Sequence, residues 1–301
     1  MTICDNIQVG EPVRHEMLSV FPLFAKSNGG IDYLLSHEAI SAGLVTVEEV
    51  DRAGSVADLT VENQGDTRVL FLEGEELVGA KQNRILNTSI LVAAKSKTKI
   101  PVSCVEQGRW QYESQRFRSS GSHSPSRLRY ALKASVSRSV NAKRGHRSDQ
   151  ERVWKEVERQ QRAFGVASGT AAMSDTFDSC KDRIDGFRVE LGYTDGASGM
   201  VVAVGRRIVA LDLFDKPSTC EKVWSRLLTG VILDSLETHK DIEEAQPRDV
   251  EAFLGILDDG PWQQVETIGE GVEHRVEEAK RQGSTLLMEG VLVHASVLAR
   301  E

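Results

Sequence analysis

The sequence lacks any apolar run near the roughly 18 residues that a membrane span needs. Its start, MTICDNIQVGEPVRHE, carries neither a basic leader nor an apolar stretch, so it does not resemble a targeting signal. We therefore expect a cytoplasmic protein without a membrane partner. Cysteine is also scarce: the four residues are scattered with no CxxC pair, which argues against a zinc ribbon and against a disulfide framework. Cys104, Cys180 and Cys220 are expected to be small apolar core residues.

Several signatures of familiar enzyme classes are missing. The sequence contains no GxGxxG after a strand, no GxxxxGK[ST], no HExxH and no GxSxG. These absences argue against dinucleotide-dependent oxidoreductases, P-loop NTPases, zincins and α/β-hydrolases. The seven histidines are dispersed and none is paired at metal-ligand spacing, so no metal site is assigned. His294, in the apolar run VLVHASVL, is expected to be a hydrogen-bonded strand histidine and not a catalytic base.

Charge is distributed unevenly along the chain, whose formal net charge is −8. Residues 1–113 carry ten basic and 16 acidic side chains, residues 114–165 carry 13 and four, and residues 166–301 carry 14 and 25. A segment of net charge +9 therefore lies between two acidic segments. It suits contact with phosphate or nucleic acid, because clustered Arg and Lys neutralise phosphates. The alternative is that it folds back onto the acidic parts of its own chain or of a second copy.

The first 113 residues are predicted to be rich in strands. Leu59 and Val61 alternate with polar residues, and the turn residues 63–66 predict a hairpin after them. Short runs rich in β-branched residues predict further strands at 69–72, 90–92 and 100–105. The lysine-rich stretch 95–99 is expected to be a solvated connection. These short, neighbouring strands indicate an antiparallel, sandwich-like sheet.

The rest of the chain is predicted to mix helices with strands. Residues 114–147 are rich in Ser and Arg, which predicts a basic linker or loop. Periodicity and capping signals predict helices at 148–165, 177–191, 218–232 and around 250–257, and strands at 200–204, 207–214, 262–268, 272–276 and 284–298. The expected fold class is α+β, with an N-terminal antiparallel β-sandwich-like half (1–113), the linker or loop (114–147) and a helix-rich α+β half (148–301). Alternatively, the two halves form one continuous domain.

The densest chemistry lies between Leu72 and Trp110, in LEGEELVGAKQNRILNTS and PVSCVEQGRW. Carboxylates that share a face suit acid/base catalysis or Mg²⁺ binding, and in an extended segment Glu73 and Glu75 point to one side and Glu76 to the other. Guanidinium groups suit phosphate or carboxylate, and an indole can stack on a base or sugar. The candidate catalytic residues are therefore Glu73, Glu75 and Glu106, and the candidate ligand-binding residues are Lys81, Gln82, Asn83, Arg84, Asn87, Arg109 and Trp110. The structural alternative is a buried Glu–Arg network that joins two hairpins, with Trp110 as core filler.

The same motifs carry a resemblance. VLFLEGEELVGAKQNRILNTSILV and IPVSCVEQGRW, followed by QERVW and VALDLF, resemble the ARPP-1 family, the ARG and Rhodanese-Phosphatase-superfamily-associated Proteins. The resemblance runs from about Glu11 to Leu298 and is strongest in the first half. The family is named for genes beside those of ADP-ribosylglycohydrolase and phosphatase-like proteins, which implies ADP-ribose or nucleotide-derived substrates. Carried over position by position, its motif selects the same residues between Glu73 and Trp110.

Three kinds of function remain open on these grounds. The first is a binder or processing enzyme of an anionic, nucleotide-derived or ADP-ribose-like small molecule, held by the Glu/Arg/Trp site with Mg²⁺ as a conceivable cofactor. The second is a nucleic-acid-associated module that uses the basic segment 114–165. The third is a scaffold or homo-oligomer in which that segment contacts acidic surface. An open hollow beside the Glu and Arg side chains favours the first, whereas mutual saturation in a sealed interior favours an architectural role for them.

Overall fold

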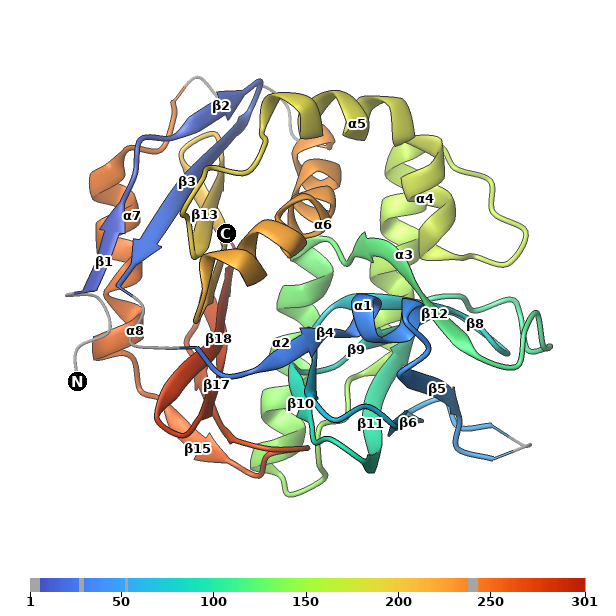
Figure 1. Ribbon diagram of the computed structural model, residues 1–301. Helices are drawn as coiled ribbons and strands as arrows, with labels where there is room; N and C mark the ends of the chain where they lie inside the picture. The colour runs from blue at the N-terminus through green and yellow to red at the C-terminus, as the bar shows by residue number, and fades with distance from the viewer. Residues whose placement is uncertain (1–5, 27–29, 52–53, 238–242, 301) are drawn as a thin grey trace.

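The computed structural model describes residues 6–26, 30–51, 54–237 and 243–300. Its largest sheet is antiparallel throughout and draws strands from both ends of the chain (Figure 1). In hydrogen-bonded order its strands are β1 (Ile7–Val9), β3 (Leu18–Ala25), β13 (Gly199–Val204), β14 (Arg207–Phe214), β18 (Val291–Ala299), β17 (Arg281–Met288), β16 (Val272–Glu277) and β15 (Gln263–Val265), with β2 (Val13–His15) on β3. Because β3 pairs with β13, the first residues of the chain complete the sheet of the second half.

The other two sheets form the sandwich expected of the first half. The first consists of β10 (Ile90–Val92), β7 (Arg68–Phe71) and β4 (Tyr33–Leu35); the second consists of β12 (Phe117–His123), β8 (Glu75–Gly79), β9 (Arg84–Leu86), β11 (Ser96–Cys104), β6 (Asp58–Asn63) and β5 (Val45–Glu49). Apolar side chains from both sheets, such as Phe71 and Leu86, share one buried cluster. All these strands pair antiparallel except β4, which is parallel to β7. The α+β class and the strand-rich first half are therefore confirmed.

Helices cover both faces of the largest sheet. The helices are α1 (Ser36–Ser41), α2 (Ser126–Asn141), α3 (Gln150–Phe164), α4 (Met173–Ser179), α5 (Lys181–Glu190), α6 (Pro217–Leu236), α7 (Pro247–Leu254) and α8 (Ile256–Asp259). Figure 1 shows α7 and α8 on the outer face, with α2 and α6 toward the first-half strands. This double cover explains why β13 is apolar along its whole length: Val201 packs in the cluster with α7, and Val202 packs in the cluster with α6.

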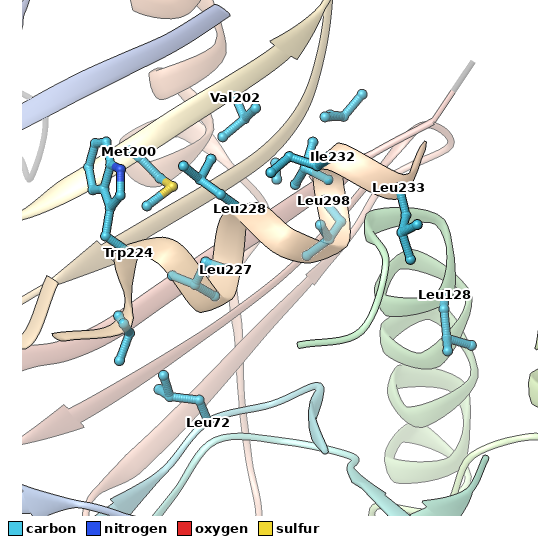
Figure 2. Close-up of a cluster of buried hydrophobic side chains, with 14 of the residues drawn as sticks. Leu72, Leu128, Met200, Val202, Trp224, Leu227, Leu228, Ile232, Leu233 and Leu298 are labelled. Atoms are coloured by element: carbon cyan, nitrogen blue, oxygen red, sulfur yellow. The ribbon is translucent and has the colours of Figure 1, made fainter. Parts of the chain in front are cut away.

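Helix α6 is the main apolar contact between the layers. Figure 2 shows Trp224, Leu228 and Ile232 lying along this helix near Met200 and Val202 of β13. In the same view, the side chain of Leu72, which follows β7, points toward the helix from the first-half strands. All of these side chains are buried. The hydrophobic core therefore continues from one half of the chain into the other.

Some local expectations are corrected by the structure. The turn at 63–66 does not close a hairpin, because β6 pairs with β5 and β11 while β7 pairs with β4 and β10. The lysine-rich stretch 95–99 is largely the first half of β11, whose side chains alternate between exposed and half-buried before the strand enters the core. The helix expected at 177–191 is interrupted at Cys180, so it forms α4 and α5. Helix α3 is capped by Asp149, which accepts from the Arg152 amide, and not by Ser148.

Residues 114–147, expected to be a linker or loop, instead contain β12 and α2. Helix α2 turns two of its cations into the protein interior. The Arg129 guanidinium donates to both carboxylate oxygens of Asp212 on β14, at 2.9 and 2.7 Å, and to the Ser296 hydroxyl at 2.8 Å. The Lys133 ammonium donates to the Glu73 carboxylate and, at 2.6 Å, to the Ser284 hydroxyl. The basic segment is thus folded onto acidic residues of its own chain.

The pKa values of these groups reflect the competition between burial and pairing. Burial lowers the pKa of Lys133 to about 8, although Glu73 opposes the shift. Burial acts to raise the pKa of Asp212, but the Arg129 guanidinium outweighs it and holds that pKa well below its usual range. Removing one partner of such a pair leaves an uncompensated charge in the interior.

We predict that Lys133→Met lowers the free energy of unfolding by about 3–5 kcal/mol, because it leaves the Glu73 carboxylate buried without its ammonium partner. Lys133→Met combined with Glu73→Gln should recover much of that loss, since the carboxylate is then gone as well. Urea unfolding followed by circular dichroism measures both. The control is Lys155→Met, which removes an exposed ion pair with Glu151 and should leave stability nearly unchanged. A Lys133→Met protein as stable as the control would contradict the buried ion pair.

Candidate functional site

The sequence motif occupies a tight region of the first-half sheet. Strands β8 and β9 are joined by a turn in which Ala80 has a positive φ of 41° and Gly79 one of 119°. A Cβ on Gly79 would lie 2.6 Å from the Ser114 hydroxyl, so this turn has no room for a larger residue. The turn carries Lys81, Gln82 and Asn83 against the end of β11. Residues far apart in the sequence therefore meet at one end of the sandwich.

Glu106, Arg109 and Asn83 are brought together as the sequence suggests. Arg109 donates to the Glu106 carboxylate from Nε at 2.8 Å and from Nη2 at 2.6 Å. Its remaining N–H groups reach the Asn83 side-chain oxygen and the Ala80 and Gln111 carbonyls. Burial acts to raise the pKa of Glu106, but the hydrogen bonds from Arg109 and from the Asn83 amide hold it below its usual value. The polar groups of Glu106 and Arg109 are thus already hydrogen-bonded to each other and to neighbouring protein groups.

Gln82 and Arg84 extend this cluster inward. Gln82 donates to the Glu106 carbonyl at 2.8 Å and accepts from Arg84 Nη1 at 3.0 Å and from the Cys104 thiol at 3.2 Å. Arg84 is fully buried, and its Nη2 lies 4.0 Å from a carboxylate oxygen of Glu49 on β5. Burial lowers the pKa of the Arg84 guanidinium. Cys104 is a buried free thiol whose pKa burial raises, which agrees with the core role expected for it.

An aromatic edge of the cluster faces solvent. Trp110 is 48% exposed and Tyr112 51% exposed. The Lys81 ammonium lies 5.0 Å from the indole centroid and 5.2 Å from the phenol centroid. Trp110 is therefore not core filler, in contrast to the structural alternative. The exposed indole face is the part of the predicted site that a ligand can reach directly.

The other predicted carboxylates do not form a pair. Glu73 is bonded to Lys133 and lies 3.6 Å from Arg129 Nε, whereas Glu75 accepts from Ser36, Ser119 and Arg226. The two carboxylates therefore neutralise different cations on α2 and α6. The Asn87 side chain donates to the His146 carbonyl at 2.9 Å and accepts from the Ser103 hydroxyl, so it fixes a loop.

A third carboxylate, Glu76, is fully buried. Burial raises its pKa to about 7, and the Ser120 hydroxyl only partly offsets that shift. The negative charges of Glu106 and Asp178 act in the same direction as burial.

A hydrogen-bonded relay of Ser89, His294 and Asp212 lies beneath the motif. The Ser89 hydroxyl is 2.9 Å from His294 Nδ1, and His294 Nε2 is 3.2 Å from an Asp212 carboxylate oxygen. All three are buried, and burial lowers the pKa of His294. Their geometry resembles a nucleophile–base–acid arrangement, but none of the hollows described below is lined by them. His294 is thus the bonded strand histidine that the sequence suggests.

A large opening lies elsewhere, between α2, α3 and the edge where β14 begins and β18 ends. This basic groove has a volume of about 850 Å³, within the range of small-molecule sites. Its lining includes seven cations, Arg127, Arg152, Lys155, Arg159, Arg162, Arg207 and Arg300, against the three acids Glu156, Glu158 and Asp234. An excess of positive charge therefore lines the groove of a chain that carries −8 overall.

The groove has an apolar floor and a mixture of paired and available cations. Ala131 and Val209 line it, and Tyr130 presents its ring to the Arg300 guanidinium at 5.3 Å. Arg159 is held between Glu156 and Glu237 at 2.8 and 2.5 Å. Arg152, in contrast, makes no ion pair within the described residues.

Comparison with known families gives a match over nearly the whole chain. The model for the ARG and Rhodanese-Phosphatase-superfamily-associated Protein domain, ARPP-1, matches residues 6–298. The chain belongs to the ARPP-1 family. The match covers the Glu/Arg/Trp cluster of this ARPP-1 chain and the lining of the basic groove except Ala299 and Arg300. No curated protein and no solved structure matches it.

Two further tests of the ARPP-1 structure concern metals and membranes. Among residues 6–26, 30–51, 54–237 and 243–300, no three His, Cys, Asp or Glu side chains gather closely enough to hold a metal ion. Within the same ranges, no helix is both long and apolar enough to cross a bilayer. Cys4 lies outside the described residues, and Cys180 and Cys220 are buried free thiols.

Sequence reasoning anticipated only part of the groove. The basic segment supplies its α2 and α3 residues, but Arg207 and Arg300 were not singled out. They meet because β14 and β18 pair antiparallel, with Ala210 opposite Leu298. The inward cations Arg129 and Lys133 were also missed. Their spacing of four residues, on the same helix face as Leu132 and Val136, was the available signal.

We predict that Glu76→Gln stabilises the ARPP-1 chain increasingly as pH rises from 5 to 8. With its pKa raised from 4.5 to about 7, folded Glu76 binds more proton than unfolded Glu76 in this window, so wild-type stability falls as pH rises. Glu76→Gln has no ionisable group at this position and does not lose stability in this way. Its free energy of unfolding relative to the wild type should therefore rise by up to about 3 kcal/mol across this pH range. Urea unfolding at several pH values measures the difference. The matched control is Glu190→Gln, at an exposed position; a constant difference for Glu76→Gln would contradict the buried carboxyl.

Proposed function

We propose that this protein binds an anionic, nucleotide-derived small molecule and that the basic groove is where it binds. The observation that carries the proposal is the groove itself, about 850 Å³ in volume and lined by seven cations against three acids. Guanidinium groups donate in a planar fork that suits phosphate oxygens, so this lining favours a phosphorylated ligand. The family name records ARG and the Rhodanese-Phosphatase superfamily, and the ADP-ribose-related substrates that the sequence resemblance implies make ADP-ribose the natural first probe.

The mixture of groups in the groove supports a molecule with both charged and apolar parts. Arg152 and Lys155 lie one turn apart on α3 and line the same groove. The Tyr130 ring and the Ala131 and Val209 side chains supply apolar contact for a base or sugar. The Ser126 hydroxyl in the lining donates to Asp234, whose pKa burial raises to about 6. The lining thus favours binding, and we assign no catalytic step to it.

Ligand binding at the Glu/Arg/Trp site stays a second prediction, limited to its exposed aromatic edge. Glu106 and Arg109 are bonded to each other, and Glu73 and Glu75 are bonded to cations of α2 and α6, which favours a structural role for these groups. Trp110 and the neighbouring Tyr112 retain an exposed edge on which a base could stack, beside the largely buried Lys81. A nucleic-acid partner for the segment 114–165 is a third prediction, because α3 and the outward residues of α2 carry the groove cations.

We predict that ADP-ribose binds to the full-length protein and that Arg152→Ala/Arg300→Ala weakens the affinity at least about tenfold, because each lost guanidinium removes charge-assisted hydrogen bonds to phosphate. Isothermal titration calorimetry at a fixed salt concentration measures the affinity of each protein for ADP-ribose. The charge-matched control is Lys181→Ala/Arg183→Ala on α5, which lies outside the groove and should bind as the wild type does.

Trp110→Ala separates the two sites. The groove proposal predicts unchanged affinity in this variant. Loss of binding in Trp110→Ala, with normal affinity in Arg152→Ala/Arg300→Ala, would move the ligand to the Glu/Arg/Trp site. Absence of binding in the wild type would remove ADP-ribose as the ligand.

A further inference from the structure

A second hollow, of about 380 Å³, lies at the connection between α2 and α3. Three serines and three arginines line it: Ser135, Arg138, Ser139, Arg144, Arg147 and Ser148. It shares no lining residue with the basic groove. A third, shallower hollow lies between these two. Arg138 lines both it and the second hollow, and Arg152 lines both it and the basic groove. We call the second hollow the α2–α3 hollow.

Two of the three cations of the α2–α3 hollow have no acidic partner among the described residues. Arg138 and Arg144 make no ion pair within the described part of the chain, and Arg147 has only a contact of 3.6 Å with Asp58. Asp149 also lines the hollow, but its carboxylate accepts from the Arg152 amide and so caps α3. The hollow therefore presents three guanidinium groups to whatever enters it.

The hydroxyl of a largely buried serine completes the set of donors. Ser139 is only 6% exposed, and its hydroxyl has no hydrogen-bond partner among the described residues. Ser135 donates to the Leu132 carbonyl, and Ser148 shares a hydrogen bond with Ser103, so both are already engaged. An unpaired hydroxyl at the wall of a cationic hollow is suited to donate to a phosphate oxygen.

The loop that carries two of the arginines is fixed in place. His146, between Arg144 and Arg147, is buried. Its Nε2 lies 2.8 Å from a Glu273 carboxylate oxygen, and its carbonyl accepts from the Asn87 side chain at 2.9 Å. Arg144 and Arg147 therefore leave the loop on either side of an anchored residue. Such preorganisation reduces the entropy lost when a ligand is bound.

We propose that the α2–α3 hollow is a binding site for a phosphate group, separate from the basic groove and independent of its function. Arg138 and Arg144 supply the charge, and Ser139 supplies a hydroxyl donor. The volume exceeds that of a phosphate ion alone, which favours the phosphate of a small phosphomonoester such as a sugar phosphate. Free orthophosphate has the same chemistry and is the other source to test.

The test titrates the full-length protein with ribose 5-phosphate and, separately, with orthophosphate, by isothermal titration calorimetry at fixed ionic strength. We expect ribose 5-phosphate to bind, with the affinity falling at least about tenfold in Arg138→Ala/Arg144→Ala and about three- to tenfold in Ser139→Ala. Tighter binding of ribose 5-phosphate than of orthophosphate supports the phosphomonoester. Equal or tighter binding of orthophosphate, lost in the same variants, supports the site with the free ion as its ligand.

Two controls make the outcome decisive. Lys181→Ala/Arg183→Ala removes the same net charge from exposed positions on α5, and Arg152→Ala/Arg300→Ala alters the basic groove. Both should bind ribose 5-phosphate as the wild type does. The proposal is overturned if neither phosphate compound binds at millimolar concentration, or if the α5 control weakens binding as much as Arg138→Ala/Arg144→Ala does. Loss confined to the groove variant would overturn it too, while supporting the groove.

Discussion

The rest of the structure depends on two buried cations of α2. Arg129 and Lys133 are 1% and 0% exposed, and each faces an acid from a different part of the chain, Asp212 of β14 and Glu73 before β8. A charge in the interior is tolerated only when it is paired and hydrogen-bonded, so these contacts restrict how α2 can lie between the sheets. They also tie the first-half strands to α2, because Glu73 precedes β8 and its carboxylate is bonded to Lys133. Apolar packing around α6 then fills the remaining space between the halves.

Helix α2 carries cations on two faces, one turned toward the protein interior and one toward solvent. Its inward cations are neutralised by the acidic parts of the chain, whereas Arg127 and Arg138 remain on its outer surface and line hollows. This division explains how a chain of net charge −8 presents a basic groove and a second cationic hollow on one side. The two hollows differ in kind: the groove has an aromatic and apolar floor, and the α2–α3 hollow has hydroxyl groups. The groove therefore suits a ligand with both phosphate and base or sugar parts, and the α2–α3 hollow suits a phosphate group.

Much of the fold follows from the sequence because it depends on local patterns. The alternation of Leu59 and Val61, the apolar run of β14 and the helix over 150–164 are each visible within a few residues. What could not be predicted depends on long-range pairing. No local signal says that β3 pairs with β13, or that β6 avoids β7 and joins β11. The segment 114–147 looked like a linker because its Ser and Arg content is typical of loops, and only the distant acids make its cations compatible with a buried helix.

The candidate site, too, could be predicted from the sequence only in part. Composition alone identified the Glu, Arg and Trp residues near the turn after β8, and Glu106 and Arg109 do meet there. It could not say that their hydrogen bonds are already made within the protein, since that depends on where Ala80 and Asn83 place their oxygens. Nor could it show that Arg207 and Arg300, 93 positions apart in the numbering, share a groove with α3. Ionic crowding in a sequence therefore indicates a buried network as readily as a ligand site.

The most direct measurement is amide hydrogen exchange by mass spectrometry on the intact protein, with and without saturating ADP-ribose. The account predicts slower exchange on addition of ligand in α3 and at the start of α2, which together form a wall of the groove, and no change between residues 81 and 112. Slower exchange confined to residues 81–112, with α3 unaffected, would contradict it and place the ligand at the exposed indole instead.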